Sequence, residues 1–140
     1  MSRKFKRSFN RAGAYLVSCS NSGSDNVPRG RDSAKITGAQ GVLEAGTVLG
    51  QITATKVYTK HNPTAADGSE KASAILFGTL DTGDAGGAAT PVDCTIDRMD
   101  IAVHGGYLVL AEGITAPQIV TLIADLDSVG IVIRNKSDLA

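Results

Sequence analysis

The two histidines, His61 and His104, are the residues of this chain best suited to general acid–base catalysis. A catalytic histidine needs a nucleophile or a second acid within hydrogen-bond reach. No G-x-S-x-G or comparable nucleophile motif accompanies either one, and each adjoins turn-forming residues, Asn62-Pro63 and Gly105-Gly106 respectively. We therefore interpret both as solvated or turn residues. A hydrolase that uses one of them with a nearby aspartate stays open as an alternative.

Metal and phosphate sites find little support in the pattern. Cys94 and His104 are ten residues apart and have no C-x-x-C or H-x-x-x-H partner. The glycine-rich segment 81–91 is acidic and lacks the G-K-[ST] ending of a phosphate-binding loop. The aspartates in and after it do not follow the EF-hand pattern, so we expect them to be solvated: Asp81, Asp84, Asp93, Asp97 and Asp100. The sequence predicts no catalytic, metal-binding or cofactor-binding residues.

The stretch AGTVLGQI, residues 45–52, is also similar to the glycine-turn-strand pattern of biotinyl and lipoyl carrier domains. Those domains attach their cofactor to a lysine at a hairpin tip, in a Met-Lys or Asp-Lys setting. Lys56, Lys60 and Lys71 have no such neighbours. We therefore expect no attached cofactor and no small-molecule substrate.

The two cysteines, Cys19 and Cys94, do not form a disulfide framework. We expect two free thiols in a chain that is made in a reducing cytoplasm. The N-terminus is basic, but the apolar run after it is too short and too broken for a signal peptide. No window approaches the length of a membrane span, so we expect no membrane partner.

Charge is unevenly distributed, although the net charge of the chain is zero. Residues 1–35 hold eight basic and two acidic residues, a net charge of +6, and residues 36–140 carry a net charge of −6. The first segment is rich in Ser, Asn, Gly and Arg and lacks hydrophobic periodicity, apart from a short β-prone patch at 14–18. Such a segment buries too little apolar area to offset its ordering entropy. We predict a flexible basic N-terminal arm over residues 1–35 and a single domain over 36–140.

Aromatic and basic residues alternate at the start of this arm. Three interpretations stay open: binding to nucleic acid, docking on an acidic protein face with aromatic anchors, or a solubilising terminus. We favour the second, and the acidic charge of residues 36–140 argues against a large nucleic-acid-binding face. The predicted partner-binding residues are Arg3, Lys4, Phe5, Lys6, Arg7, Phe9, Arg11 and Tyr15.

The remaining residues predict a mainly β domain of short strands. The chain has 16 Gly, six aromatic residues and no Trp, so its core must consist of Val, Ile, Leu and Ala. We expect strands over 47–55, continued by 57–59, and over 72–80 and 92–99, with Gly50 marking a bulge or a close backbone approach. In the last of these, Val92, Cys94 and Ile96 share one face. We also expect residues 101–103 and 107–110 to flank a tight connection at 104–106.

The hydrophobic period changes near the C-terminus. Thr115 and Pro117 have the character of a helix start. An apolar stripe follows at i, i+3, i+4 and i+7, and Gly130 can end the helix in left-handed geometry. The stripe consists of Ile119, Leu122, Ile123 and Leu126. A final strand at 131–134 and a short tail complete the predicted domain.

The whole pattern resembles the bacteriophage head decoration proteins, the family of the lambda capsid-stabilising protein D. The resemblance covers about residues 36–134. In the first half of this range it lies in Gly46–Ile52 and in Asp67-Gly68-Ser69 before Ala74-Ile75-Leu76. In the second half it lies in the loop 81–91 with the strand after it, and in the closing helix with Gly130–Arg134. These motifs are glycines, β-branched runs and spacings. The arm departs from this resemblance, because it is longer and more basic than the family pattern leads one to expect.

The resemblance implies a small β-clip-like decoration domain with one C-terminal helix, and a structural virion protein without enzymatic activity. It further implies homotrimers on the outer surface of the expanded icosahedral head, at threefold and quasi-threefold points, where they hold neighbouring major capsid proteins together against internal DNA pressure. The N-terminal arm would order on the capsid lattice. The alternative is a nucleic-acid-binding module that uses the arm.

Overall fold

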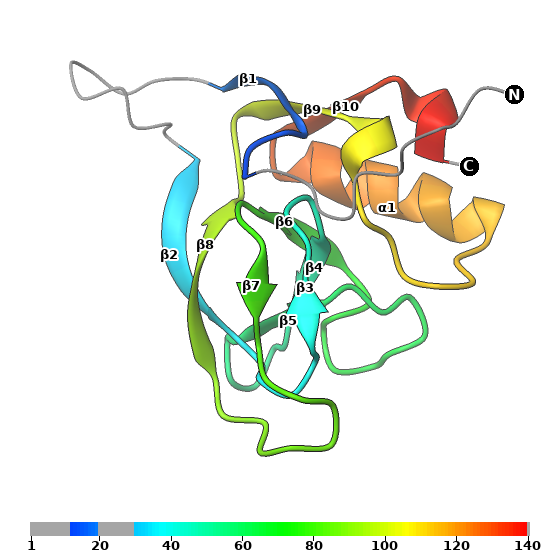
Figure 1. Cartoon of the computed structure of the whole chain (residues 1–140). Helices are drawn as coiled ribbons and strands as arrows, with labels where there is room; N and C mark the ends of the chain where they lie inside the picture. The colour runs from blue at the N-terminus through cyan, green and yellow to red at the C-terminus, as the bar shows by residue number, and fades with distance from the viewer. Residues whose placement is uncertain (1–11, 20–29, 140) are drawn as a thin grey trace, which may run out of the picture.

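The computed structural model describes residues 12–19 and 30–139, and it confirms a mainly β chain with one α-helix near its C-terminal end (Figure 1). The strands are β1 (Leu16–Cys19), β2 (Arg31–Ile36), β3 (Val42–Leu43), β4 (Val48–Gln51), β5 (Tyr58–Lys60), β6 (Ala72–Leu76), β7 (Leu80–Asp81), β8 (Val92–Asp97), β9 (Ile101–His104) and β10 (Ile131–Arg134). The helix is α1 (Ala116–Ser128), and two 3-10 turns are η2 (Gly105–Tyr107) and η3 (Lys136–Leu139).

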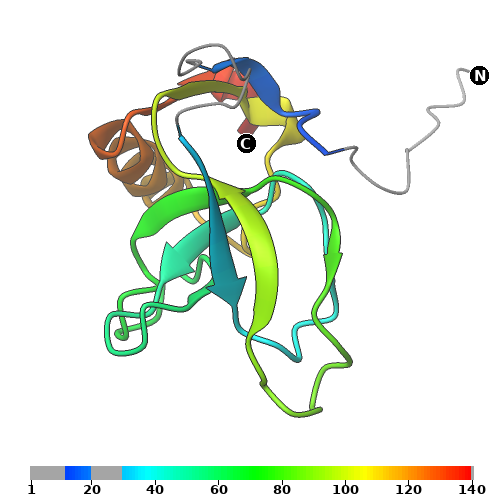
Figure 2. The ribbon, with the colours of Figure 1, turned by 90° about the vertical axis from the view of Figure 1, so that its left-hand side faces the viewer.

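Five strands close into a small barrel in the order β2-β5-β4-β6-β8. Its longest ladder joins β2 and β8, which run antiparallel over six residue pairs from Arg31↔Asp97 to Ile36↔Val92 (Figure 2). The alternation predicted for β8 is confirmed, because Val92, Cys94 and Ile96 all pack in the barrel core. The short pair of β3 and β7 lies outside the barrel order as a separate two-stranded sheet.

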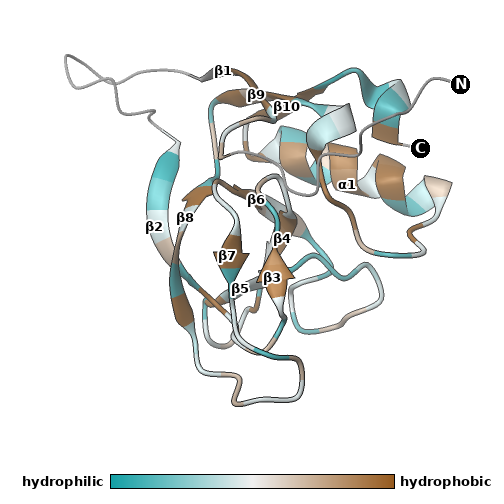
Figure 3. Cartoon of the chain, in the orientation of Figure 1, coloured by the Kyte–Doolittle hydropathy of each residue, from teal (hydrophilic) through white to brown (hydrophobic). Residues whose placement is uncertain are grey.

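The second unit of the fold is a three-stranded sheet, β1-β9-β10, with α1 packed beside it (Figure 1). The predicted helix is confirmed: Thr115 precedes it, and the Gln118 side-chain oxygen accepts a hydrogen bond from the Thr115 N–H at 2.9 Å. Leu122 and Leu126 of its apolar stripe are fully buried, and hydrophobic and hydrophilic bands alternate along the helix (Figure 3). Gly130 follows at φ +84°, as expected for a left-handed helix end.

Strand β4 joins the two hydrophobic cores because both of its faces are buried. Val48 belongs to the core under α1, whereas its neighbour Leu49 belongs to the barrel core. The irregularity predicted at Gly50 is confirmed: the β4–β6 register shifts between Leu49 and Gly50, and a Cβ on Gly50 would lie 2.3 Å from the Ser69 carbonyl oxygen. Only glycine tolerates that approach.

Two of the expected strand boundaries are wrong. The strand predicted over 47–55 ends at Gln51, and Tyr58–Lys60 is a separate strand that returns antiparallel to β4. The turn between them has Lys56 at φ +60° and contains no glycine or proline, so the usual turn signals are missing. The strand predicted over 72–80 likewise ends at Leu76.

The hairpin predicted around residues 104–106 is also wrong. Gly105–Tyr107 forms a 3-10 turn, and β9 pairs with β1 and β10 instead of with the residues that follow it. A Cβ on Gly105 would lie 2.7 Å from the Asn135 carbonyl oxygen, so this glycine serves a close approach to the C-terminal segment. The expected tail also differs, because Leu139 in η3 is buried in the core.

Two segments of the expected arm form strands. Residues 16–19 pair with β9, as the β-prone patch at 14–18 suggested. Residues 31–35, placed in the arm on composition, belong to barrel strand β2. The first half of β2 is hydrophilic (Figure 3), and only Ala34 and Ile36 pack in the barrel core, which explains why composition alone did not indicate a strand.

Candidate functional site

Seven of the eight predicted partner-binding residues lie outside the described part of the chain. They are Arg3, Lys4, Phe5, Lys6, Arg7, Phe9 and Arg11. The eighth, Tyr15, lies within it, just before β1. The structure therefore locates the point at which this basic segment joins the domain.

Tyr15 is a core residue and does not lie on a binding surface, because only 1% of it is exposed. Its hydroxyl donates a hydrogen bond to the carboxylate of Asp97, and its carbonyl oxygen accepts one from the His104 N–H at 2.7 Å. Burial, together with the hydrogen bond to Asp97, raises the pKa of Tyr15, so the hydroxyl keeps its proton and acts as a donor.

Asp97, at the end of β8, is fully buried, so the prediction that it is solvated is wrong. Besides Tyr15, it contacts the guanidinium group of Arg31, whose Nε lies 2.9 Å from Oδ1 and whose Nη2 lies 3.4 Å from Oδ2. The guanidinium carbon of Arg31 lies 3.7 Å from the centre of the Phe77 ring, a cation–π contact. We refer to Tyr15, Arg31, Phe77 and Asp97 as the Asp97 anchor.

Sequence reasoning missed the Asp97 anchor because its members are far apart in the chain. The hydrogen bonds of Asp97 span 66 residues to Arg31 and 82 residues to Tyr15. No local spacing signals such a cluster. Its only trace in the sequence is an aspartate directly after the buried Ile96, in a strand where the two faces alternate.

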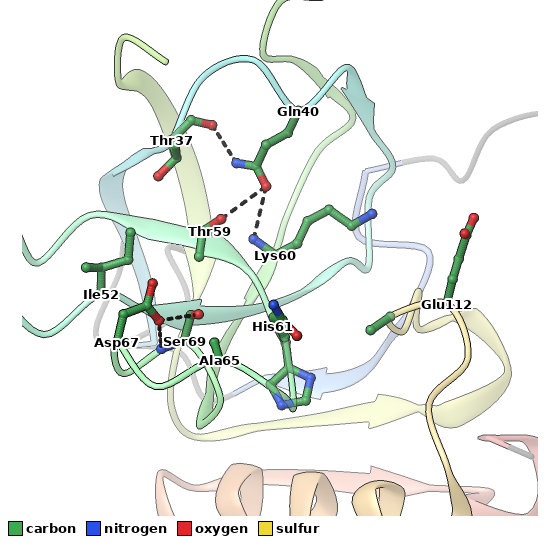
Figure 4. Close-up of a pocket in the computed structure, with 12 residues that line it drawn as sticks. Thr37, Gln40, Ile52, Thr59, Lys60, His61, Ala65, Asp67, Ser69 and Glu112 are labelled. Carbon is green, nitrogen blue, oxygen red and sulfur yellow. Dashed lines mark hydrogen bonds between the residues drawn. The ribbon is translucent and has the colours of Figure 1, made fainter. Parts of the chain in front are cut away.

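A polar depression of about 430 Å³ lies on another part of the barrel (Figure 4). Its side chains hydrogen-bond to one another: the Gln40 oxygen accepts from the Thr59 hydroxyl and from the Lys60 N–H, and its amide nitrogen donates to the Thr37 carbonyl. Asp67 accepts from the N–H and the hydroxyl of Ser69, which lowers the pKa of its carboxyl group. The one hydroxyl–carboxylate pair among the lining residues, Ser69 and Asp67, is a poor catalytic pair, because a carboxylate with a lowered pKa is a weak base.

His61 borders this depression, yet its ring points away from the other labelled residues and toward α1 (Figure 4). The residue is buried, with 4% exposed, so the prediction of a solvated histidine is wrong. Its Nε2 lies 3.0 Å from the Glu70 carbonyl oxygen, and its Nδ1 has no hydrogen-bond partner among the described residues. Burial lowers the pKa of His61, which favours the neutral ring.

His104 has the predicted turn role. Its Nδ1 accepts a hydrogen bond from the Gly106 N–H at 3.1 Å, and its Nε2 lies 2.9 Å from the Asn135 side-chain nitrogen. The Tyr107 ring packs edge-on against it, with 5.3 Å between ring centres. Nδ1 therefore caps η2, and Nε2 connects this turn to the segment that follows β10.

Cys94 is a free thiol on the barrel strand β8, and burial raises its pKa to about 11, so it is a poor nucleophile at neutral pH. The side chain of Cys19 lies outside the described residues. Across residues 12–19 and 30–139, no three His, Cys, Asp or Glu side chains are grouped to bind a metal ion. Within the same ranges, no helix has the length and hydrophobicity to cross a membrane.

Comparison with known families supplies the decisive observation, since the family model of bacteriophage lambda head decoration protein D matches residues 21–131. The chain belongs to this family. The match takes in the whole barrel and α1, and it starts within the segment that composition assigned to the arm. The family comprises structural head decoration proteins and is not a family of enzymes, which supports a role in decorating a phage capsid. No curated protein sequence matches the chain significantly.

Proposed function

We propose that this chain binds the outer surface of an expanded icosahedral phage head as a homotrimer and stabilises it against internal DNA pressure. The family match over residues 21–131 carries the proposal, because it spans the described barrel and α1. In this account the protein is made in the bacterial cytoplasm and resides on the virion, and its partner is the lattice of major capsid proteins.

The basic segment, residues 1–11, is the proposed capsid contact. It holds five basic residues and no acidic one, and Phe5 and Phe9 lie among them. Arginines and aromatic residues are enriched among the residues that dominate protein interfaces. Tyr15 is not part of this proposed contact, since its side chain is buried against Asp97.

A trimer would strengthen binding without any new type of contact. Three linked copies make the second and third binding events intramolecular, so that weak individual contacts add up to a high avidity. Closed threefold symmetry also matches a lattice that offers threefold positions. Sedimentation equilibrium of the purified chain tests this part directly, because it should give three times the chain mass of 14.4 kDa.

Co-sedimentation with expanded, undecorated capsids tests the function itself. We expect saturable binding by the full chain at one copy per capsid protein subunit, and clearly weaker binding by a chain that lacks residues 2–12. The circular dichroism spectrum and oligomeric state of the truncated chain should be unchanged, because both cores lie within residues 13–19 and 30–139. Absence of binding by the full chain would contradict the proposal.

A nucleic-acid-binding module is the second candidate, favoured by the alternation of aromatic and basic residues before residue 12. Its signature is an affinity for free DNA or RNA that falls steeply as the salt concentration rises. The net charge of −6 on residues 36–140 opposes an extended nucleic-acid face. Strong salt-dependent binding to DNA, together with no binding to capsids, would establish this alternative.

A further inference from the structure

Three elements meet at the start of β6, where α1 packs against the barrel. His61, directly after β5, has its Nε2 3.0 Å from the Glu70 carbonyl oxygen. Asp125, on α1, accepts a hydrogen bond from the Ala72 N–H, with 3.4 Å between the nitrogen and Oδ2. The two side chains therefore hold the same short stretch of backbone, residues 70–72, and they hold it from different elements.

The contact with Glu70 fixes the position of the hydrogen on the neutral ring of His61. A carbonyl oxygen only accepts hydrogen bonds, so Nε2 must carry the hydrogen and donate it. Nδ1 of the neutral ring then has a lone pair and no hydrogen, and it has no partner among the described residues. The ring points toward α1 (Figure 4). A proton added to His61 must therefore attach to this buried nitrogen.

The charged groups near His61 leave Asp125 as the counter-charge for such a proton. The side chains of Glu70 and Lys71 line a separate depression of about 280 Å³. Burial lowers the pKa of His61, and the hydrogen bond with the Glu70 carbonyl and the charge of Asp125 act in the opposite direction. Three further charged side chains line the depression away from which the ring points: Lys60, Asp67 and Glu112.

The present bond of Asp125 is one that a protonated ring is able to displace. The N···O distance of 3.4 Å to Ala72 is longer than the usual range of about 2.7–3.2 Å, so this bond is weak. A hydrogen bond from an imidazolium to a carboxylate is charge-assisted and roughly twice as strong as one from a neutral donor. Protonation of His61 thus supplies a stronger donor for the carboxylate than the backbone N–H that it holds.

We propose that His61 and Asp125 form a pH-sensitive switch at the junction of α1 with the barrel. Near neutral pH the ring is neutral and Asp125 accepts from the Ala72 N–H. In acid a proton from solvent attaches to Nδ1 of His61, and the Asp125 carboxylate exchanges the Ala72 N–H for this new donor. The start of β6 is then released from α1, while the loop after β5 becomes bonded to the helix. The inference goes beyond the proposed function and does not depend on capsid binding.

The start of β6 is a sensitive place for such an exchange, because this strand contributes to both hydrophobic cores. Ala72 and Ile75 belong to the core under α1, whereas Ala74 and Leu76 belong to the barrel core. A change in the bonding of Ala72 therefore acts on the packing of α1 against the barrel.

NMR spectroscopy of the full chain, from about pH 7.5 to about pH 4.5, tests the switch. The chain has only two histidines, so the ring signals of His61 and His104 are readily assigned. We expect the Ala72 amide proton to move upfield as its hydrogen bond is lost, with the same midpoint as the His61 ring. His104 is the internal reference, since its titration should not appear in the Ala72 signal.

Two neighbouring aspartates of α1 provide a matched pair of variants. Asp125→Asn removes the counter-charge, so it should lower the titration midpoint of His61 by about 0.5 pH unit or more. Asp127→Asn removes an exposed charge from the same helix and should leave the midpoint unchanged. His61→Gln should abolish the response of the Ala72 amide to acid, and this variant keeps the test decisive if Asp125→Asn does not fold.

Three results would overturn the inference. The first is an Ala72 amide signal that does not follow the midpoint of His61. The second is a midpoint for Asp125→Asn that equals or exceeds that of the original chain. The third is unfolding before the His61 ring titrates, because the switch requires a folded, protonated state. All three are measured without capsids, so failure of this inference is distinguishable from failure of the proposed function.

Discussion

Asp97 and His61 are both buried ionisable side chains, but their surroundings differ. Asp97 contacts a guanidinium group and accepts a hydrogen bond from Tyr15. His61 has one ring nitrogen at the Glu70 carbonyl and one without a partner among the described residues. Asp97 joins three segments of the chain, whereas His61 lies within a single loop that packs toward α1.

The difference shows where this fold tolerates a buried charge. A charge can be buried when a counter-charge and hydrogen-bond donors accompany it, as at Asp97. At His61 burial lowers the pKa of the ring despite the nearby Asp125 carboxylate, so the neutral imidazole is favoured. The first arrangement ties the N-terminal segment to the barrel, and the second makes one loop sensitive to acid.

Breaking the Asp97 anchor should have the largest effect on stability. Asp97→Ala leaves the Tyr15 hydroxyl buried without an acceptor and Arg31 without its counter-ion, so we expect a loss of about 3 kcal/mol in the free energy of unfolding. Urea unfolding measures this loss. A value below about 1 kcal/mol would mean that the anchor relaxes without strain, which would contradict its description as a tightly bonded cluster.

Acidification should have a smaller effect, acting through His61. Burial lowers the pKa of this histidine in the folded chain below its unfolded value of about 6.5, so the unfolded state binds protons more readily. The stability that neutral His61 contributes to the folded chain is therefore fully present above about pH 6.5. It is lost as the pH falls from this value toward the lower pKa of the folded state. Urea unfolding at a series of pH values measures this loss.

His61→Gln is the control for this pH dependence, since it removes the titratable ring from the same position. The difference in stability between the original chain and the variant should shift in favour of the variant as the pH is lowered. A difference that stays constant across this range would show that His61 does not titrate differently on folding.

Removal of the exposed ion pair between Lys35 and Asp93 should have the smallest effect. Lys35→Ala breaks a contact of the same length as the Arg31–Asp97 contact, to within a few tenths of an ångström, but in solvent. We expect a loss of about 0.5 kcal/mol or less, which added salt should reduce further. A loss as large as that of Asp97→Ala would remove the distinction between the two ends of the β2–β8 ladder.

The features that the sequence predicted well are those specified by neighbouring residues. The alternation of Val92, Cys94 and Ile96 predicts β8, and the apolar stripe with Gly130 after it predicts α1, because each pattern follows the period of its own element. The irregularity at Gly50 was predictable for the same reason. Local periodicity reports local backbone geometry.

The features that could not be predicted from the sequence depend on partners far away in the chain. The glycines after His104 indicated a hairpin, but none forms there because β9 pairs with β1 and β10. Tyr15 looked like an arm residue, because its acceptor lies 82 positions later. The charges of β2 suggested a solvated segment, although its ladder with β8 closes the barrel. Tertiary pairing of this kind leaves no spacing in the sequence to detect.

A reconstruction by electron cryomicroscopy of expanded capsids saturated with this chain tests the central claim most directly. We predict density for three copies of the barrel-and-helix domain around each threefold and quasi-threefold position on the outer surface, with the chain before Tyr15 directed into the capsid lattice. Capsids without added density after saturation, or density only at other positions, would contradict the account.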